Sequence, residues 1–439
     1  MTDSNLRPIS RREFLALSAL SGAAVLTGCA TNPVTGKKEL MFISEAEEIR
    51  MDSEAAPHQF SADYGPVEDP ALNAYLAQVG NSLAERSHRP GMPYTFRVVN
   101  ASHVNAYAFL GGSIAATRGI MLAMDDEAEL AALLGHELGH VNARHAARSM
   151  TSGILAQVAV AAATVAVAEK NEDWAPVVAG LGGIGAGALL ARYSRAHERE
   201  ADALGMEYMV RSGYNPQGMI GLQDILVKMS HGKPNVIELM FATHPMSQER
   251  YDTAVKRARS EYSESASLPL YRERYMDSTA ALRKLQPTVD DIQKGDKAVS
   301  AKKLEEGLAH YKAALQKTPD DYEALLKASK VCLALNRPAD AQSYAAAAKA
   351  AYPQEAQSYH VEGMAALYNS RYDKALADFN HYDRILPGNP NTTFYSGFAL
   401  EGMGRKAEAS AKYKAYLQAV GEGAEAQHAF NRVTQWQQW

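Results

Sequence analysis

Three apolar runs stand out from a chain in which hydrophobic and polar residues are otherwise mixed. The first covers residues 14–26, and two later runs, rich in Ala and Gly, cover residues 154–167 and 180–190. A membrane-spanning helix needs about 20 apolar residues, and each of these runs is shorter. We interpret the two later runs as a helical hairpin and candidate lid packed beside the site described below. A membrane-contacting hairpin is the alternative.

The first apolar run predicts an export signal. Basic residues, among them Arg11 and Arg12, precede the run, which ends in Leu-Thr-Gly before Cys29. A basic start, a short apolar run and a small-residue end are typical of a secretory signal. The arginine pair resembles a twin-arginine signal, and the end resembles a lipobox. We therefore predict a lipoprotein signal peptide at 1–29 and a periplasmic protein with a lipid anchor at Cys29. Because Ala30 rather than Asp follows, we favour the outer membrane.

The C-terminal part repeats with a period of 34 residues. Three prolines follow this step, and small or aromatic residues follow it in three further registers. The residues are Pro319, Pro353 and Pro387; Gly295, Ser329, Gly363 and Gly397; Gly307, Ala341, Ala375 and Ala409; and Tyr311, Ala345, Phe379 and Tyr413. This spacing is typical of tetratricopeptide repeats. We predict about four repeats in residues 288–439, after a linker at 263–287, with a concave surface for a peptide or partner protein.

Acidic residues at 125–127 predict the start of a helix that runs to residue 149. Inside it, His136 and His140 are four residues apart, so they lie about 40° apart around the helix axis and face one point. Two such imidazoles suit two corners of a zinc tetrahedron, and Glu137 beside them can accept a proton. A surface helix with two ordinary histidines is the alternative reading.

A second helix, at residues 193–202, offers a third ligand. Glu198 and Asp202 share a helix face, whereas Glu200 is rotated by about 200° from Glu198. On geometry alone, both Glu198 and Glu200 remain candidate ligands. Asp202 beside the site would orient a ligand imidazole. Without the histidine motif, a solvated charged helix would explain the same residues.

Three motifs together resemble one known family. HELGH at 136–140, SRAHEREAD at 194–202 and Thr-His-Pro at 243–245 are similar to the HtpX and CAAX prenyl protease family of zinc metallopeptidases. Unlike the membrane-bound members, this chain has no run long enough to span a bilayer around these motifs. The resemblance covers nearly all of the chain after the signal segment.

The resemblance implies a role for each matching residue. It makes Glu198 the third metal ligand after His136 and His140, with Asp202 as its supporting aspartate. It also implies that His244 approaches the metal or stabilises the reacting carbonyl, next to Glu137 as the catalytic base. From the residues alone, His244 would be an ordinary loop histidine. We interpret His145, five residues beyond His140, as structural.

The segment at 105–117 resembles the strand-forming part that precedes the zinc helix in this family. In proteases of this kind, an edge strand holds an extended substrate by main-chain pairing. A plain sheet strand followed by a glycine turn is the alternative.

Length and charge narrow the remaining possibilities. The 439 residues predict two folded domains, and a net charge of -5 gives no electrostatic reason to expect nucleic acid. The chain has two cysteines, Cys29 and Cys332. With Cys29 lipidated, no intramolecular disulfide is possible.

The sequence thus predicts an α+β, mostly helical, zincin-like metalloprotease domain at 30–262 followed by an all-α tetratricopeptide-repeat solenoid. We expect an endopeptidase with one Zn²⁺ per chain that degrades misfolded or stalled outer-membrane and periplasmic proteins. The repeats would bind these unfolded or misassembled substrates, or the outer-membrane assembly machinery. The alternative is an assembly scaffold or chaperone with little proteolytic turnover.

The anchor at Cys29 is testable by fractionation. We expect Cys29→Ala to move the protein from the membrane fraction to the soluble periplasm, because a lipid chain is the predicted attachment. Ala30→Ser, which leaves the cysteine in place, serves as the control. Unchanged membrane fractionation of Cys29→Ala would contradict the anchor.

Overall fold

The computed structural model describes residues 29–155, 193–232 and 234–437. Two predicted segments lie outside the described residues: the signal peptide up to residue 28, and most of the apolar segment interpreted as a lid. Among the helices that are described, none is long and apolar enough to cross a membrane.

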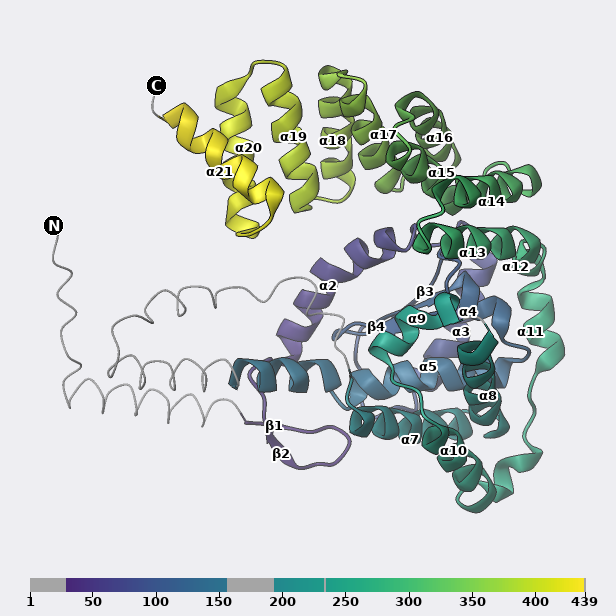
Figure 1. Cartoon of the computed structure of the whole chain (residues 1–439). Coiled ribbons are helices and arrows are strands. Elements are labelled where there is room, and N and C mark those ends of the chain that lie inside the picture. The colour runs from purple at the N-terminus through teal and green to yellow at the C-terminus, as the bar shows by residue number, and fades with distance from the viewer. Residues whose placement is uncertain (1–28, 156–192, 233, 438–439) are drawn as a thin grey trace, which may run out of the picture.

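The N-terminal part (residues 29–283) is mostly helical with two small sheets (Figure 1). Its elements are β1 (Cys29–Thr31), β2 (Lys38–Leu40), α2 (Glu45–Ala62), α3 (Pro70–Ala84), β3 (Thr95–Val99), β4 (Ala106–Ala108), β5 (Ser113–Thr117), α4 (Arg118–Ala123), α5 (Glu127–Asn142), α7 (Arg195–Arg211), α8 (Gln217–Gly232), α9 (Pro234–Thr243), α10 (Gln248–Ser260), η3 (Ser263–Ser267), α11 (Arg272–Ser278) and α12 (Ala280–Arg283).

The larger sheet has the strand order β3-β5-β4. β5 pairs parallel to β3, with Phe96 opposite Ile114, and antiparallel to β4, with Ala106 opposite Ala116. β4 is therefore an edge strand of the described sheet. It comes from the segment predicted to form a strand before the zinc helix.

α5 is the central helix of the N-terminal part, and every one of its residues is buried. Asp126 caps its start by accepting a hydrogen bond from the backbone N–H of Glu129, at 2.9 Å. Glu127, one residue further on, accepts hydrogen bonds from Tyr75 (2.8 Å) and Tyr214 (2.9 Å). These contacts hold the start of the helix, and the apolar core surrounds the rest.

α5 and α7 pack backbone against backbone because small residues line their contact. A Cβ atom on Gly139 would lie 2.9 Å from the Cα of Ala201, and one on Gly135 would lie 2.9 Å from the carbonyl oxygen of Gly205. Real Cβ atoms do not come this close to backbone atoms. The glycines thus bring the helix that carries the two histidines next to the helix that carries Glu198.

The histidine helix is shorter than predicted. α5 ends at Asn142, Arg144 adopts a left-handed φ of 55°, and residues 145–155 are helical again. Buried contacts hold Arg144 in this conformation: its Nε donates to Glu48 at 2.9 Å, and its Nη2 donates to the carbonyl of Ile43 at 2.7 Å. The prediction of one continuous helix to residue 149 is therefore wrong.

The C-terminal part consists of paired antiparallel helices, as the 34-residue period predicts (Figure 1). The helices are α13 (Gln286–Ser300), α14 (Leu304–Lys317), α15 (Tyr322–Ala334), α16 (Pro338–Ala351), α17 (Gln357–Tyr368), α18 (Tyr372–Ile385), α19 (Pro390–Gly402), α20 (Lys406–Ala419) and α21 (Ala424–Gln437). A mostly helical domain with a small sheet, followed by all-α repeats, confirms the predicted fold class.

Glycines and aromatic residues of the repeat registers meet in the pairs α13–α14, α17–α18 and α19–α20. A Cβ atom on Gly363 would lie 2.6 Å from the ring of Phe379, and one on Gly397 would lie 2.9 Å from the ring of Tyr413. The aromatic ring thus fills the space that the missing side chain leaves. The small and aromatic positions recur together for this reason.

A buried charge network joins the repeats to the N-terminal part. Arg118, at the start of α4, donates to Asp321 at 2.7 and 3.0 Å and to Glu323 at 2.9 Å. Glu323 also accepts from Ser102 at 2.8 Å and pairs with Lys327 at 2.7 Å. Burial acts to raise the pKa of Glu323, but Lys327 and Arg118 outweigh it and lower this pKa to about 2. The carboxylate therefore stays ionised.

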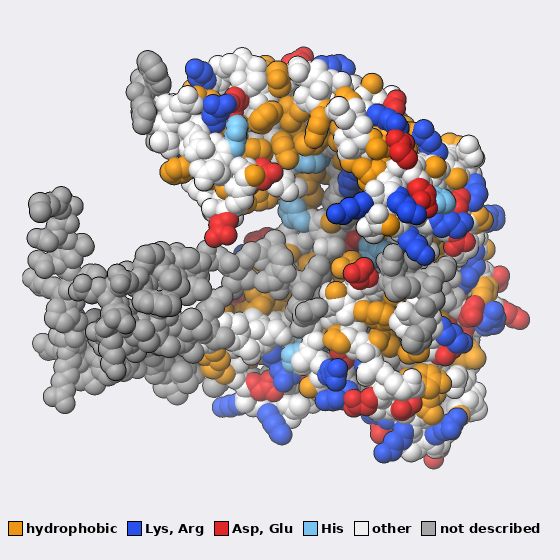
Figure 2. Space-filling view, viewed as in Figure 1, with side chains coloured by type: hydrophobic (Ala, Val, Ile, Leu, Met, Phe, Trp, Pro, Cys, Tyr) orange, Lys and Arg blue, Asp and Glu red, His pale blue; other side chains and the backbone are white. Residues whose placement is uncertain are grey.

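The repeats carry a groove of 410 Å³ between α17, α19 and the start of α21. Figure 2 shows hydrophobic side chains along this side of the repeats. Aromatic side chains such as Tyr368, Phe394 and Phe398 line the groove, together with Glu425 and His428. Tyr368 is 57% exposed and Phe398 39%. Large apolar side chains exposed to this degree are typical of a binding surface.

The contact between α5 and α7 is testable at Gly139. We expect Gly139→Ala to destabilise the protein by about 1–3 kcal/mol through overpacking and to weaken zinc binding, because the helices must move apart. Chemical denaturation and zinc titration measure the two effects. Gly91→Ala is the control, since a Cβ there meets nothing within 4 Å. Wild-type stability and zinc affinity in Gly139→Ala would show that the close approach is not needed.

Candidate metal centre and active site

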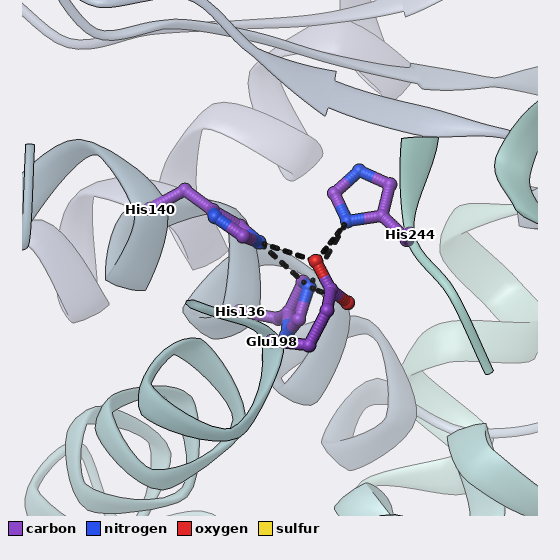
Figure 3. Close-up of side chains that lie close together, drawn as sticks. All are labelled: His136, His140, Glu198 and His244. Atoms are coloured by element: carbon purple, nitrogen blue, oxygen red, sulfur yellow. Dashed lines mark hydrogen bonds and ion pairs between the residues drawn. The ribbon is translucent and has the colours of Figure 1, made fainter. Parts of the chain in front are cut away.

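His136 and His140 lie one turn apart on α5 and point to the same place (Figure 3). Their Nε2 atoms are 3.1 Å apart, and both side chains are buried. Burial lowers the pKa of His140 well below its ordinary value, with Glu198 opposing this effect. The ring of His140 is therefore neutral at physiological pH, as a metal ligand must be.

Glu198 reaches the two histidines from the first turn of α7. Its Oε1 lies 3.3 Å from the Nε2 of His140, while Arg250 holds its Oε2 at 2.7 Å. Burial acts to raise the pKa of Glu198, but the nearby histidines, His244 first among them, hold this pKa far below its usual range. A fully ionised carboxylate with one oxygen held by an arginine offers the other oxygen to a cation.

His244 completes the cluster from the segment that follows α9. Its Nδ1 lies 3.3 Å from the Nε2 of His136 and 3.2 Å from the Oε1 of Glu198 (Figure 3). The side chain is buried. One ligand atom from each of the four residues lies within 4.8 Å of the others.

The spacing of these atoms fits a tetrahedral metal ion. With ligands about 2.0–2.1 Å from Zn²⁺, neighbouring corners of a tetrahedron are about 3.3–3.4 Å apart. Four of the separations between these ligand atoms are 3.1–3.3 Å, and all of the ligand atoms lie within 4.8 Å of one another. Two imidazoles and a carboxylate, with a third imidazole at the fourth corner, are also a donor set that suits zinc. The residues present therefore fit the predicted ion.

Glu137 lies beside the cluster, and its carboxylate makes no hydrogen bond within the described part of the chain. Its side chain is 0% exposed, and neither carboxylate oxygen has a hydrogen-bond partner among the described residues. The nearest charged contact is the Nε2 of His244, 3.8 Å from Oε1. Burial raises the pKa of Glu137. A buried carboxylate left unpaired is costly, so this position is typical of a catalytic role rather than a structural one.

Asp202 contacts His136 from the next turn of α7. Its Oδ1 lies 2.9 Å from the Nδ1 of His136, the nitrogen that faces away from the cluster. An acceptor on this side keeps the proton on Nδ1 and leaves the lone pair of Nε2 free for a metal. The orienting role of Asp202 stays a prediction, and this contact is the observation that supports it.

Arg250 is a site residue that the sequence analysis missed. It lies in the first turn of α10, is buried, and donates to Asp202 through Nε and Nη2, both at 2.7 Å. Together with its contact to Glu198, this makes Arg250 a bridge between two carboxylates of α7. The only sequence signal was an arginine six residues after His244, inside a polar stretch.

Glu200 points away from the cluster, so the structure separates the two candidate carboxylates. It lies 3.1 Å from the Nε2 of His145 and 3.2 Å from Arg148. His145 itself lies 2.9 Å from the Nδ1 of His140. The sequence analysis interpreted His145 only as structural; the structure places its ring against that of His140, after the break at Arg144.

Comparison with known proteins agrees with this geometry. Residues 70–258 match the model of peptidase family M48, and residues 298–362 match that of a tetratricopeptide repeat. The chain thus has a region similar to M48 peptidases, followed by a region similar to tetratricopeptide repeats. This confirms the resemblance to a metallopeptidase family that the motifs indicated.

Named relatives lie among bacterial proteases. The beta-barrel assembly-enhancing protease of Yersinia pestis is 31% identical over 212 residues, which cover 46% of this chain and 42% of that protein. The protein of the same name from Escherichia coli K12 is 29% identical over 197 residues, covering 44% and 40%. Metalloprotease YcaL of Escherichia coli K12 is 29% identical over 249 residues, covering 54% and 93%. The chain thus spans about two fifths of the length of the beta-barrel assembly-enhancing proteases that it matches.

The position of His244 at the fourth corner predicts a restraining role. We expect His244→Ala to change the resting metal coordination and to raise basal cleavage, because the fourth corner becomes open to water. X-ray absorption of the zinc-loaded protein reports the loss of one nitrogen ligand. Thr243→Ala, next to the histidine but outside the cluster, is the control. Lower activity with unchanged coordination would contradict the restraint and favour a role for His244 in stabilising the reacting carbonyl.

Proposed function

We propose that this protein is a zinc-dependent endopeptidase of the bacterial cell envelope. The observation that carries the proposal is the cluster of His136, His140 and Glu198 with the unpaired carboxylate of Glu137 beside it. The M48 peptidase match and the protease names of the relatives support the reaction class. His136, His140 and Glu198 would hold one Zn²⁺ per chain, with Asp202 orienting His136.

In this proposal each residue performs one part of peptide hydrolysis. A Zn²⁺ ion held by His136, His140 and Glu198 would supply a Lewis acid for polarising the carbonyl and activating water. Glu137 accepts the proton of the attacking water on its free carboxylate and then gives it to the amine that leaves. His244, once away from the fourth corner, is placed to donate to the developing oxyanion. Arg250 holds one oxygen of Glu198 and leaves the other as the donor oxygen.

Substrate would bind in extended form along β4. This strand lies at the edge of the described sheet, and main-chain pairing there places few demands on side chains. Tyr193 also borders the site, because its ring stacks on His140 at 3.8 Å and its backbone N–H donates to the carbonyl of Thr243 at 3.2 Å. Such a site selects chains that are unfolded rather than one particular sequence.

The proposed substrates are misfolded or stalled outer-membrane and periplasmic proteins. The aromatic groove between α17 and α21 is suited to an exposed apolar segment of such a chain, or to a component of the outer-membrane assembly machinery. The envelope location, with the lipid anchor at Cys29 and the outer membrane, rests on the signal and lipobox patterns of the sequence. The names of the relatives support an envelope role.

A scaffold or chaperone with little turnover is the second candidate. The observation that favours it is the imidazole of His244 at the corner where water must enter. The intact Glu137 argues against it, since binding alone does not need a buried, unpaired carboxylate.

The deciding experiment combines zinc content with cleavage of casein for wild type and Glu137→Gln. We expect one zinc per chain in both and a loss of about 10²–10⁴-fold in the rate of cleavage for the variant, because the general base is removed while the ligands remain. Glu207→Gln, a carboxylate of α7 paired with Arg211 far from the cluster, is the control. Zinc without cleavage in either form would favour the scaffold or an enzyme restrained by His244, and cleavage by His244→Ala would separate these two. Absence of zinc in the folded wild type would reject the proposal.

A further inference from the structure

We propose that His145 and Glu200 form an orienting pair, which fixes the tautomer and direction of His140 so that its Nε2 can bind metal. The proposal rests on the proposed zinc site and assigns a function to a histidine and a carboxylate outside the ligand set. They act on the metal through His140, so they are positioning residues.

The pair extends outward from His140 as a chain of polar contacts. The Nδ1 atoms of His140 and His145 are 2.9 Å apart, and the Nε2 of His145 lies 3.1 Å from the Oε2 of Glu200. Arg148 contacts the same oxygen at 3.2 Å. The side chain of His145 is 0% exposed, so water does not compete for its nitrogens.

Only one arrangement of protons lets His140 bind a metal ion. Its Nε2 must present a lone pair, so its Nδ1 carries the proton and donates it to a partner. That partner is the Nδ1 of His145, which must then be an acceptor, with its own proton on Nε2. This second proton points at Glu200, and a carboxylate can only accept. The anchor at Glu200 therefore sets the direction of the whole chain.

The opposite direction would prevent metal binding. If the Nδ1 of His145 donated to His140, the Nε2 of His140 would carry a proton toward Glu198 instead of a lone pair. Glu200 excludes this arrangement, because the Nε2 of His145 would then face a carboxylate with no proton between them. Arg148 contacts that carboxylate at 3.2 Å and holds it in place.

The surrounding fold holds the ring of His145 against His140. The left-handed φ of Arg144 turns the chain immediately before His145, and the ring of His197 stacks on that of His145 at 4.3 Å with an interplanar angle of 15°. The backbone conformation and the stacking each hold the imidazole of His145 where its Nδ1 can accept the hydrogen bond from His140.

The two ligand histidines thus have separate supports on the same helix. Asp202 contacts His136 directly, whereas Glu200 contacts His140 through His145. Glu198, on the same helix as these two carboxylates, is the candidate metal ligand. Three acidic residues at alternate positions of α7 therefore have three different tasks: one for the metal and one for each imidazole.

The test measures zinc affinity rather than activity, by competition with a chromogenic chelator. We expect His145→Phe, which keeps a stacking ring but no nitrogen, to weaken zinc binding by about 10–100-fold, as loss of an outer partner of a metal-bound histidine does. Glu200→Ala should weaken it by at least about 5-fold, because the direction of the chain is no longer set. The Co²⁺-loaded variants should show altered visible absorption bands, which report on the geometry of the ligands.

A double variant tests whether the two residues act together. Because Glu200 acts only through His145, His145→Phe combined with Glu200→Ala should bind zinc no more weakly than His145→Phe alone. Glu207→Gln is the matched control: this carboxylate also lies on α7, has the same 28% exposed side chain as Glu200 and pairs with an arginine. It should leave zinc affinity and the Co²⁺ spectrum unchanged.

The outcomes separate this proposal from the zinc site itself. Wild-type affinity and an unchanged Co²⁺ spectrum in both single variants would overturn the orienting pair while leaving the zinc site intact. A lower unfolding midpoint of the metal-free protein with unchanged zinc affinity would show a merely structural role and would also overturn it. If His145→Phe does not fold, Glu200→Ala decides the question alone. Absence of zinc in wild type would instead reject the proposed function.

Discussion

The close contact of α5 with α7 is the constraint on which the site depends. Gly135 and Gly139 face Ala201 and Gly205 on these helices, and no larger side chain fits between them. Two helices in such contact place side chains of adjacent turns within a few ångströms. Glu198 and Asp202 can therefore reach the face of α5 that carries the two histidines, whereas Glu200 contacts His145 beyond the end of α5. The metal cluster and both of its outer supports follow from this one approach.

Much of this arrangement was predictable because it follows a helical or repeat period. The four-residue spacing of His136 and His140, and that of Glu198 and Asp202, indicated which side chains share a face. The 34-residue step predicted the paired helices, and its small and aromatic registers are those that touch in the structure. His244 follows no such period, and only the resemblance to a family indicated it.

The missed features depend on backbone irregularity and on contacts between distant segments. Arginine is not a residue type that favours a left-handed φ, so nothing in the sequence indicated the break at Arg144. The helix was therefore predicted to continue past His145. Arg250 reaches Glu198 and Asp202 from α10, 48 residues beyond Asp202. No local spacing reveals such a contact. The sequence could not decide between Glu198 and Glu200 as the metal ligand. Periodicity shows on which side of the helix a residue lies, but not which other segment packs against that side.

The network of Arg118 with Asp321 and Glu323 limits how the N-terminal part and the repeats can change in evolution. Because one partner of a buried ion pair cannot be lost without a cost of about 3–5 kcal/mol, these positions are not free to drift one at a time. The repeats are thus not an interchangeable attachment. A chimera that joined this peptidase to the repeats of a distant relative would inherit a mismatched charge at the seam, unless residues equivalent to 118, 321 and 323 were transferred as a set.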